Sequence, residues 1–178
     1  MRFDLPDETQ MLQRTVREFA EGEVAPVAEE LDRTKAFPYE LVSAMGELGW
    51  MGIPFPEEVG GAGGTSLQYA IAVEELTRVD SSVAITLCAH TSLGTQPIYL
   101  FGDDAQKERY LPDLCAGRKL GAFGLTEPEA GSDAGNTRTR ARLEDGGWVI
   151  DGAKQFITNA GTDISGHVTL SVRTGGNE

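Results

Sequence analysis

The chain has 178 residues, of which 40% are hydrophobic, and it carries a formal net charge of −13. This length is enough for one domain or slightly more with a packed core, and the sequence contains no run of 18 apolar residues that would span a membrane. Because nucleic acids and anionic membranes are bound through basic surface patches, the acidic balance argues against both as partners.

The N-terminal residues and the cysteines favour a reducing compartment. The first ten residues are acidic and polar, which is not the pattern of a signal peptide. Cys88 and Cys115 are 27 positions apart and lack a C-x-x-C spacing. We interpret them as free structural thiols, and a disulfide or a metal site is the alternative. We therefore expect a cytoplasmic protein without a metal site.

Residues 1–120 predict a series of helices. The first begins at a capping box formed by Asp7 and Gln10. Its apolar stripe has the three- and four-residue spacing of an amphipathic helix and contains Leu12, Val16, Phe19, Val24, Val27 and Leu31. Pro26 lies inside this stripe and is expected to kink the helix.

Two further helices are predicted on either side of a loop rich in proline and glycine, Ile53–Ser66. The first covers Pro38–Leu48 and ends at Gly49, because proline suits the first turn of a helix and glycine the position after the last turn. The second covers Ser66–Arg78, with the serine hydroxyl as its expected cap.

The remainder of this region predicts one buried helix and one short helix. Val83–Ser92 is apolar on nearly all faces, which is typical of a buried helix, and Asp80 or Ser81 is its expected cap. The short helix follows one of the aspartates at positions 103 and 104, and Pro112 is expected to stop it.

From about Gly121 the sequence changes to a β pattern. Half of the 22 glycines fall in residues 121–178, between short alternating or β-branched runs. These runs predict strands over Arg138–Leu143, Trp148–Asp151, Phe156–Thr158 and His167–Val172. The E-D-G-G sequence at Glu144–Gly147 predicts a hairpin turn between the first two.

The predicted fold class is α+β. An all-α N-terminal helical domain, residues 1–120, is followed by the opening strands of a β-barrel-like domain, residues 121–178. A sheet that stops just after a strand would leave an unpaired edge and a core with only one side. We therefore expect the chain to be the front portion of a longer protein.

The first candidate site is Phe123–Asp133, with the sequence F-G-L-T-E-P-E-A-G-S-D. A strand-like start runs into a turn of proline, glycine and short polar residues. Such a loop exposes consecutive backbone N–H groups, which can bind an anion or the edge of a heteroaromatic ring. The alternative is an ordinary connection between a strand and a loop.

The second candidate site is Lys154–Gly161. If the predicted strand is correct, Phe156 and Thr158 project from the same face, since side chains alternate along a strand. An aromatic plane and a hydroxyl two residues apart suit a flat redox-active ring. The alternative is a core phenylalanine beside a surface threonine.

Together the two segments, G-L-T-E-P-x-A-G-S-D and K-x-(aromatic)-I-T-N, resemble the flavin-binding motifs of the acyl-CoA dehydrogenase family. E-E-L-T-R-V-D-S-S at Glu74–Ser82 and F-G-x-x-x-Q-K-x-x-Y-L-P at Phe101–Pro112 also resemble the family pattern. The resemblance covers nearly the whole chain. It implies FAD as cofactor and α,β-dehydrogenation of an acyl-CoA thioester to the trans-2-enoyl product.

The resemblance also implies partners and a place in metabolism. It predicts fatty acid β-oxidation, an electron-transfer flavoprotein as electron acceptor, and a homodimer or homotetramer. Acyl-CoA oxidases and some flavin monooxygenases share the fold, so they remain an alternative. A non-catalytic, truncated binding module is another.

The family motifs imply a role for individual residues. The predicted FAD-binding residues are Phe123, Gly124, Leu125 and Thr126 at the edge of the isoalloxazine, Gly131 and Ser132 at the pyrophosphate, and Phe156, Ile157 and Thr158 against the flavin ring. Ser132 also matches a contact to the acyl-CoA substrate. Many members of the family have tryptophan where Phe156 stands.

The resemblance leaves the catalytic base unassigned. The family takes the α-proton with a glutamate from a later helical domain, and no residue of this chain matches it, so the expected base lies beyond residue 178. Glu127 matches a motif position in the flavin loop. The family also places the helix near Cys88, Ala89 and His90 close to the acyl chain, so these residues are candidate substrate contacts. Because His90 lies on an apolar helix, we favour a core histidine over a ligand contact for it.

Three arginines at alternating positions form one further feature. Arg138, Arg140 and Arg142 fall on one face of a predicted strand. A solvated strand face is the ordinary interpretation. Contact with an anionic ligand or a neighbouring subunit is the alternative.

Overall fold

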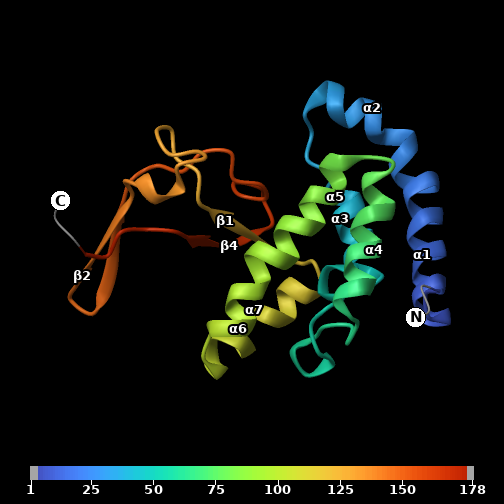
Figure 1. Ribbon diagram of the computed structural model, residues 1–178, viewed down its shortest axis with the longest axis horizontal. Helices are drawn as coiled ribbons and strands as arrows, with labels where there is room; N and C mark the ends of the chain where they lie inside the picture. Colours follow the sequence, from blue (N-terminus) through green and yellow to red (C-terminus); the bar gives the residue numbers. More distant parts are fainter. Residues whose placement is uncertain (1–3, 176–178) are drawn as a thin grey trace.

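A computed structural model describes residues 4–175, and Figure 1 shows its two parts. The helical part contains α1 (Asp7–Phe19), α2 (Ala25–Thr34), α3 (Tyr39–Glu47), α4 (Ser66–Thr77), α5 (Ser81–Cys88), α6 (Gln96–Phe101) and α7 (Asp104–Cys115). Two π-helical segments, η1 (Ala20–Val24) and η4 (Ala89–Thr95), join consecutive α-helices. Short 3-10 turns lie at Trp50–Gly52, Glu57–Val59 and Ala134–Asn136. The predicted α+β class is confirmed.

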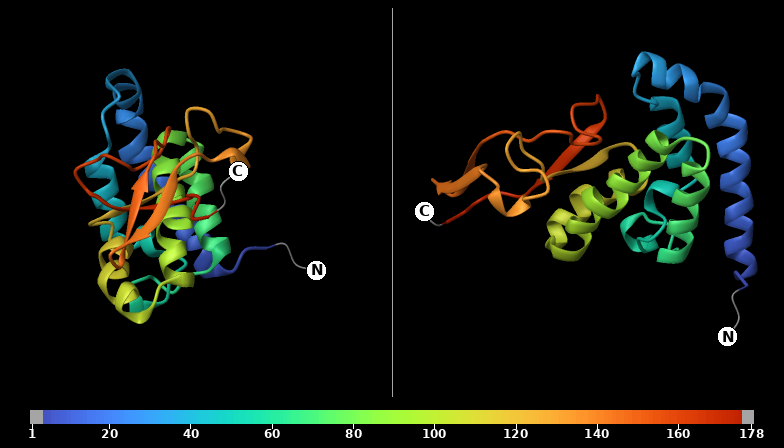
Figure 2. Two further views of the ribbon diagram at one scale, coloured as in Figure 1. Left: turned by 90° about the vertical axis from the view of Figure 1, so that its left-hand side faces the viewer. Right: turned by 45° about the horizontal axis from the view of Figure 1, so that its top comes forward.

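The β part extends away from the helices, as Figure 1 and the right-hand view of Figure 2 show. Strand β1 (Leu120–Gly124) pairs in parallel with β4 (Ser165–Leu170). Strand β2 (Arg140–Glu144) pairs in antiparallel fashion with β3 (Gly147–Asp151). Its two-residue turn is the predicted hairpin, with both central residues in the left-handed region, as a type I′ turn requires.

The hydrophobic core lies in the helical part and includes the first residue of β1. It is lined by Val16, Val24, Met45, Trp50, Met51, Leu76, Val83, Leu87 and Leu120, each no more than 4% exposed. Phe19 packs edge-on against Trp50, with ring centroids 5.1 Å apart. The predicted apolar stripe therefore faces the core, because its spacing matches the helical period, except at Val27, which is 39% exposed.

Two of the predicted caps are wrong. No side chain caps α1, and Gln10 Nε2 instead donates to the carbonyl of Leu5. Helix α4 is capped by Thr65, which forms a capping box with Gln68, rather than by Ser66. Neighbouring Thr and Ser residues have equivalent hydroxyls, so the sequence does not distinguish them; the glutamine at the third helical position favours Thr65.

The other two predicted caps are confirmed, and in each case the structure selects one of the two predicted residues. Asp80 accepts hydrogen bonds from the backbone N–H groups of Ser82 and Val83 and so caps α5. Asp103 caps α7 in a capping box with Gln106. Each carboxylate satisfies N–H groups that have no partner inside the helix.

The two prolines behave differently. Pro26 lies in the first turn of α2, directly after the π-helical η1, and α2 bends away from α1 in Figure 1, so the predicted kink is confirmed. Pro112 lies inside α7, and the prediction that it stops this helix is wrong. It falls in the last turn, where the missing N–H forfeits a single hydrogen bond before the helix ends.

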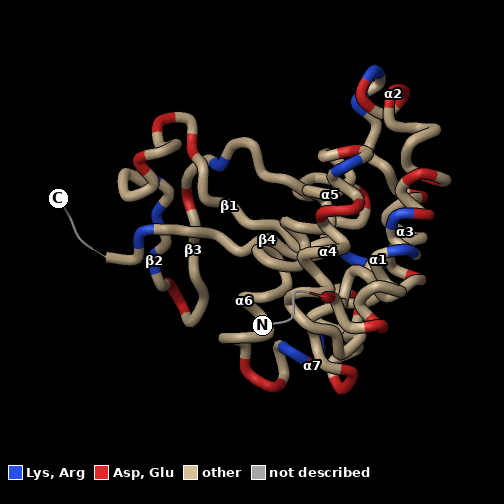
Figure 3. Tube along the Cα trace, turned by 45° about the vertical axis from the view of Figure 1, so that its right-hand side comes forward, with Lys and Arg blue, Asp and Glu red and all other residues tan. Residues whose placement is uncertain are grey.

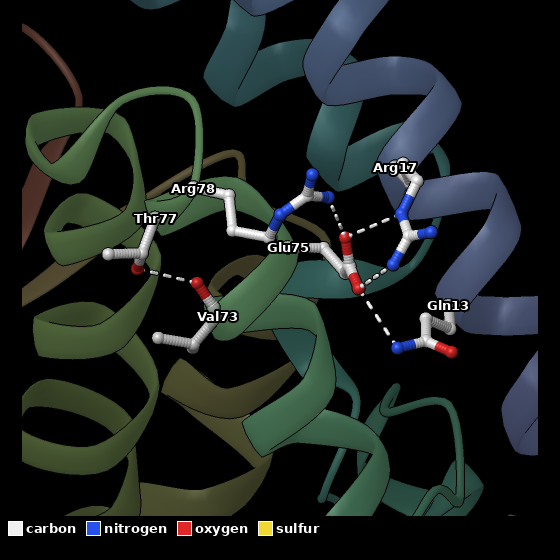
Figure 4. A network of polar contacts seen from close by, with 6 residues as sticks. All are labelled: Gln13, Arg17, Val73, Glu75, Thr77 and Arg78. Atoms are coloured by element: carbon white, nitrogen blue, oxygen red, sulfur yellow. Dashed lines mark hydrogen bonds and ion pairs between the residues drawn. The ribbon is translucent and has the colours of Figure 1, made fainter.

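One buried carboxylate joins α1 to α4. Glu75 is 1% exposed, and its oxygens accept from Arg17 Nη2 at 2.7 Å, Arg78 Nη1 at 2.8 Å and Gln13 Nε2 at 2.9 Å. Figure 4 shows the donors converging on it from both helices. The hydrogen bond from Arg17 is the main reason that the pKa of Glu75 falls to about 2, so this carboxylate is ionised at neutral pH.

We expect Glu75→Gln to lower the free energy of unfolding of the helical part by about 2 kcal/mol, because it removes charge-assisted hydrogen bonds from a buried acceptor. Guanidinium unfolding followed by circular dichroism measures this loss. Glu30→Gln is the control: Glu30 pairs with Arg33 in an exposed position, so the change should cost less than about 0.5 kcal/mol. Equal losses for both variants would contradict the prediction.

The same carboxylate predicts a pH dependence of stability. The pKa of Glu75 is about 2 in the folded protein and returns towards 4.5 on unfolding, so the unfolded state binds more protons between these values. The stabilisation is therefore complete above about pH 4.5 and is lost as the pH falls towards 2. Glu75→Gln should therefore lose less stability than the wild type over this pH range, because other carboxylates still titrate there. An unchanged pH profile in the variant would contradict the prediction.

The helical and β parts meet at two glycines. A Cβ atom on Gly94, in η4, would lie 2.3 Å from the carbonyl carbon of Gly121, in β1. A Cβ atom on Gly121 would lie 2.8 Å from the Cα of Gly94. The two backbones are therefore in direct contact, and glycine is required at both positions because any side chain would force them apart.

We expect Gly94→Ala to destabilise the protein by about 2 kcal/mol or more, since the added methyl group overpacks a backbone contact. Gly22→Ala is the matched control, because a Cβ atom on Gly22 would meet nothing within 4 Å. This control should be neutral or stabilising by up to about 1 kcal/mol, as alanine favours helices over glycine. Thermal unfolding of both variants measures the difference, and a neutral Gly94→Ala would contradict the contact.

Candidate functional site

The structure brings the two candidate segments side by side. The N–H of Gln155 donates to the carbonyl of Thr126 at 2.8 Å. Lys154 Nζ donates to the carbonyl of Leu125 at 3.1 Å. The end of β1 and the segment after β3 are thus adjacent, although they are about 30 positions apart in the sequence.

A buried ion pair holds these segments together. The Glu127 carboxylate accepts from Lys154 Nζ at 2.7 Å and from the N–H of Thr139 at 3.0 Å, and it also accepts from the N–H of Arg138. The side chains of Glu127 and Lys154 are only 2% and 9% exposed. Glu127 also closes a tight turn with Ala130 through two backbone hydrogen bonds. One carboxylate therefore fixes three stretches of chain.

This environment makes Glu127 a structural anion. The hydrogen bond from Lys154 is the main reason that the pKa of Glu127 falls to about 2. A general base must have a pKa near the operating pH, and it must reach a substrate proton. Glu127 is committed to three protein donors instead. This agrees with the motif role inferred from the sequence.

The proposed flavin contacts differ in exposure. Gly124 is buried, and Phe123, Thr126, Ile157 and Thr158 are half-buried. Leu125, Gly131, Ser132 and Phe156 are exposed. The backbone at Gly131 is open, because a Cβ atom there would meet nothing within 4 Å. The site thus offers an uncovered loop backbone beside half-buried polar side chains.

The predicted strand at Phe156–Thr158 is wrong. This segment has no strand pairing, and Phe156 has a φ of 59° with its side chain 84% exposed. Asn159 also has a positive φ, of 68°. The β-branched residues suggested a strand, but two left-handed residues in four exclude one. Phe156 and Thr158 therefore do not share a strand face. The contacts of Lys154 and Gln155 are what bring this segment next to Leu125 and Thr126.

The three helical candidates also differ in exposure. Cys88 is half-buried, Ala89 is buried and His90 is 0% exposed. The ring of His90 accepts from the N–H of Gly121 at Nδ1, at 3.0 Å, and its Nε2 lies 3.0 Å from the carbonyl of Leu114. Burial lowers the pKa of His90 to about 4, so the ring is neutral. These contacts favour the core-histidine alternative.

The cysteines are free, as predicted. Cys115 is buried, and burial raises the pKa of its thiol to about 11. A thiol with such a pKa stays protonated at neutral pH and is a weak nucleophile. Cys115 therefore serves packing in the core.

Sequence reasoning missed Asn159. Its Nδ2 donates to the carbonyl of Thr86, in α5, at 3.0 Å and to the carbonyl of Gly121 at 3.3 Å. The residue is 5% exposed. A signal was present, because asparagine is the non-glycine residue that most readily adopts the left-handed conformation found here.

The three arginines of the predicted strand, at positions 138, 140 and 142, are exposed. A hollow of about 410 Å³ is lined by Asn136, Thr137, Arg138, Arg140 and Arg173. Arg142 lies outside it and pairs with Glu144 on the same strand. Acidic residues are spread over both parts of the chain in Figure 3, with the blue segment of β2 among them.

Residues 4–175 contain neither a membrane-spanning helix nor a metal-binding cluster. No helix in this range is long and apolar enough to cross a membrane. Nor does this range contain a group of three or more His, Cys, Asp or Glu residues placed to hold a metal ion.

Comparison with known proteins places these features in a family. The family model "Acyl-CoA dehydrogenase, N-terminal domain" matches residues 6–118, and "Acyl-CoA dehydrogenase, middle domain" matches residues 122–178. A short-chain specific acyl-CoA dehydrogenase of Clostridium acetobutylicum is 52% identical over 161 residues, which are 90% of this chain and 42% of that protein.

Solved structures of acyl-CoA dehydrogenases are also similar to this chain. Butyryl-CoA dehydrogenase from Megasphaera elsdenii is 45% identical with a TM-score of 0.85, over 90% of this chain and 43% of that one. An acyl-CoA dehydrogenase complexed with FAD from Bacillus anthracis is 38% identical with a TM-score of 0.85, over 96% and 30%. The chain spans about two fifths of the length of the curated relatives it matches. Since both family models match and together cover nearly all of the sequence, the chain belongs to the acyl-CoA dehydrogenase family.

Proposed function

We propose that this chain supplies the flavin-binding segments of an FAD-dependent acyl-CoA dehydrogenase, which converts an acyl-CoA thioester to trans-2-enoyl-CoA. The observation that carries the proposal is the buried Glu127–Lys154 ion pair, which joins the two motif segments into one site. Domain boundaries near residues 120 and 121 belong to the same proposal.

The residues at this site suit a cofactor that combines a flat ring system with a charged pyrophosphate. Open backbone at Gly131 and the exposed Ser132 hydroxyl suit the FAD pyrophosphate, since consecutive N–H groups bind anions. Phe123, Gly124, Leu125 and Thr126 would hold the edge of the ring system. Phe156, Ile157 and Thr158 would lie against it. The positive φ of Phe156 supports this role, because strained backbone at a bulky residue is concentrated at ligand sites.

These residues would bind and orient the cofactor. When bound, FAD would supply hydride acceptance from the β-carbon of the acyl thioester. Hydrogen-bond donors aimed at the ring edge, such as the Thr158 hydroxyl, would favour negative charge there. The α-proton requires a base, and Glu127 is excluded from that role by its three donors. We place the base in a glutamate beyond residue 178.

Fewer residues are proposed as substrate contacts than the sequence alone indicated. Ser132 is exposed and Cys88 is half-buried, so both remain proposed contacts to acyl-CoA, together with Ala89, which follows Cys88 in the sequence. His90 is not proposed as a substrate contact, because both its ring nitrogens face backbone groups. We also propose an electron-transfer flavoprotein as acceptor, a cytoplasmic homodimer or homotetramer, and a role in fatty acid β-oxidation.

The test uses the purified protein and its visible spectrum. We expect yellow protein with flavin absorption bands, and anaerobic addition of butyryl-CoA should bleach them in a protein that also contains the base. Continued turnover with a dye acceptor, without oxygen consumption, would support the dehydrogenase. Oxygen consumption would instead indicate an oxidase, and a colourless protein that cannot be reconstituted with FAD would overturn the proposal.

We expect Lys154→Met to weaken FAD binding at least tenfold, about 1.4 kcal/mol, because the carboxylate of Glu127 would lose its counter-charge inside the protein. FAD fluorescence titration measures this affinity. Lys35→Met is the matched control, since Lys35 forms an exposed ion pair with Asp32 and should leave the affinity unchanged. Equal affinity in both variants would contradict the role of the ion pair.

A further inference from the structure

The peptide groups of Gly121 are held by two side chains from different parts of the chain. Its N–H donates to His90 Nδ1 at 3.0 Å, and its carbonyl accepts from Asn159 Nδ2 at 3.3 Å. Asn159 also donates to Thr86. Because Thr86 and His90 are four residues apart on one helical run, they lie on the same face of it. Through these hydrogen bonds, both side chains fix the position of β1 relative to the same helical segment.

The edge of the sheet explains why Gly121 needs these partners. Leu120 donates to the carbonyl of Ile164, so the backbone groups of Leu120 point towards the β4 side. Groups of successive strand residues point in opposite directions, so those of Gly121 point to the other edge of β1. Buried backbone groups must be paired, and no strand lies on that edge among residues 4–175. His90 and Asn159 take the place of a strand.

We propose that His90 and Asn159 are positioning residues, which fix β1 at Gly121 and thereby set the placement of both motif segments on the helical part. The inference rests on the proposed function in one respect, namely that these segments bind the flavin. Phe123 follows Gly121 by two residues, and Thr158 directly precedes Asn159. A displacement at Gly121 is therefore passed to both segments within one or two residues.

The direct contact with Gly94 makes this arrangement sensitive to small shifts. No side chain separates the β1 backbone from η4, so packing cannot absorb a displacement of the strand. His167 adds a third contact from β4, with Nε2 2.7 Å from the carbonyl of Gly94. The two hydrogen bonds at Gly121 are what define the position of the strand along the helix.

Two conservative variants separate the bonds of His90. An asparagine at position 90 places its Oδ1 near the position of Nδ1, so His90→Asn keeps an acceptor for Gly121. A glutamine places its Nε2 near the imidazole Nε2, so His90→Gln keeps a donor for Leu114 and loses the acceptor. Asn159→Asp keeps the shape and replaces the Nδ2 donor by an oxygen facing two carbonyls.

Thr91→Val is the matched control. Thr91 lies on the same helical segment, is 1% exposed, and its hydroxyl donates to the carbonyl of Met51 inside the helical part. Its replacement removes one buried hydrogen bond and leaves the hydrogen bonds of Gly121 in place. The control therefore reports general loss of stability.

The test measures amide hydrogen exchange in the purified protein, together with FAD affinity. We expect His90→Gln and Asn159→Asp to raise exchange of residues 121–126 at least tenfold over wild type, and to weaken FAD binding at least tenfold. His90→Asn should restore both towards wild type. Thr91→Val should change neither, at a comparable loss of melting temperature.

The outcomes distinguish the two ideas. Exchange at residues 121–126 that merely follows melting temperature across all four variants would overturn the positioning role. Selective exchange without FAD binding by the wild-type protein would support the positioning of the strand and overturn the proposed function. Selective exchange with unchanged FAD affinity would show that the placement of these segments does not govern cofactor binding, which would overturn the inference.

Discussion

The direct contact between the backbones of Gly94 and Gly121 is the constraint on which the rest of this structure depends. A sheet usually packs on a helix through a layer of side chains. Here the β1 backbone lies on η4 itself, because neither residue has a Cβ atom. The strand that leads into the first motif is thereby brought against the helical core, and Leu120 becomes part of that core.

This close approach buries backbone polar groups of β1, and side chains supply the hydrogen bonds that these groups need. Backbone groups on the free edge of β1 are removed from water and need partners. A neutral histidine and an asparagine provide them, from a helix and from a loop. The histidine must be neutral for this purpose, since Nδ1 has to accept, and burial keeps it so.

Two buried carboxylates organise the two parts in similar ways. Glu75 joins α1 to α4, and Glu127 joins the two motif segments. Each accepts from several donors, so the low pKa of each reflects stabilised negative charge. Such groups are suited to holding structure.

The sequence by itself determined the α+β class, most helices, the hairpin turn at Glu144–Gly147 and the family, because each depends on local spacing or on a motif read in order. It narrowed two helix caps to a pair of neighbouring residues each. It did not determine the conformation of Phe156 or the groups that His90 contacts. A β-branched run predicts a strand unless a neighbouring residue is left-handed, and a histidine on an apolar helix has the same pattern as a core residue or a ligand contact.

Only the tertiary structure decided which distant groups meet. Lys154 and Glu127, or Asn159 and Thr86, have no pattern that links them in the sequence, since their contacts arise when β1 is placed on η4 and the chain returns beside it. The physical reason is that a buried polar group takes whatever partner the packed backbone brings within hydrogen-bond reach, and that choice is set by the fold as a whole.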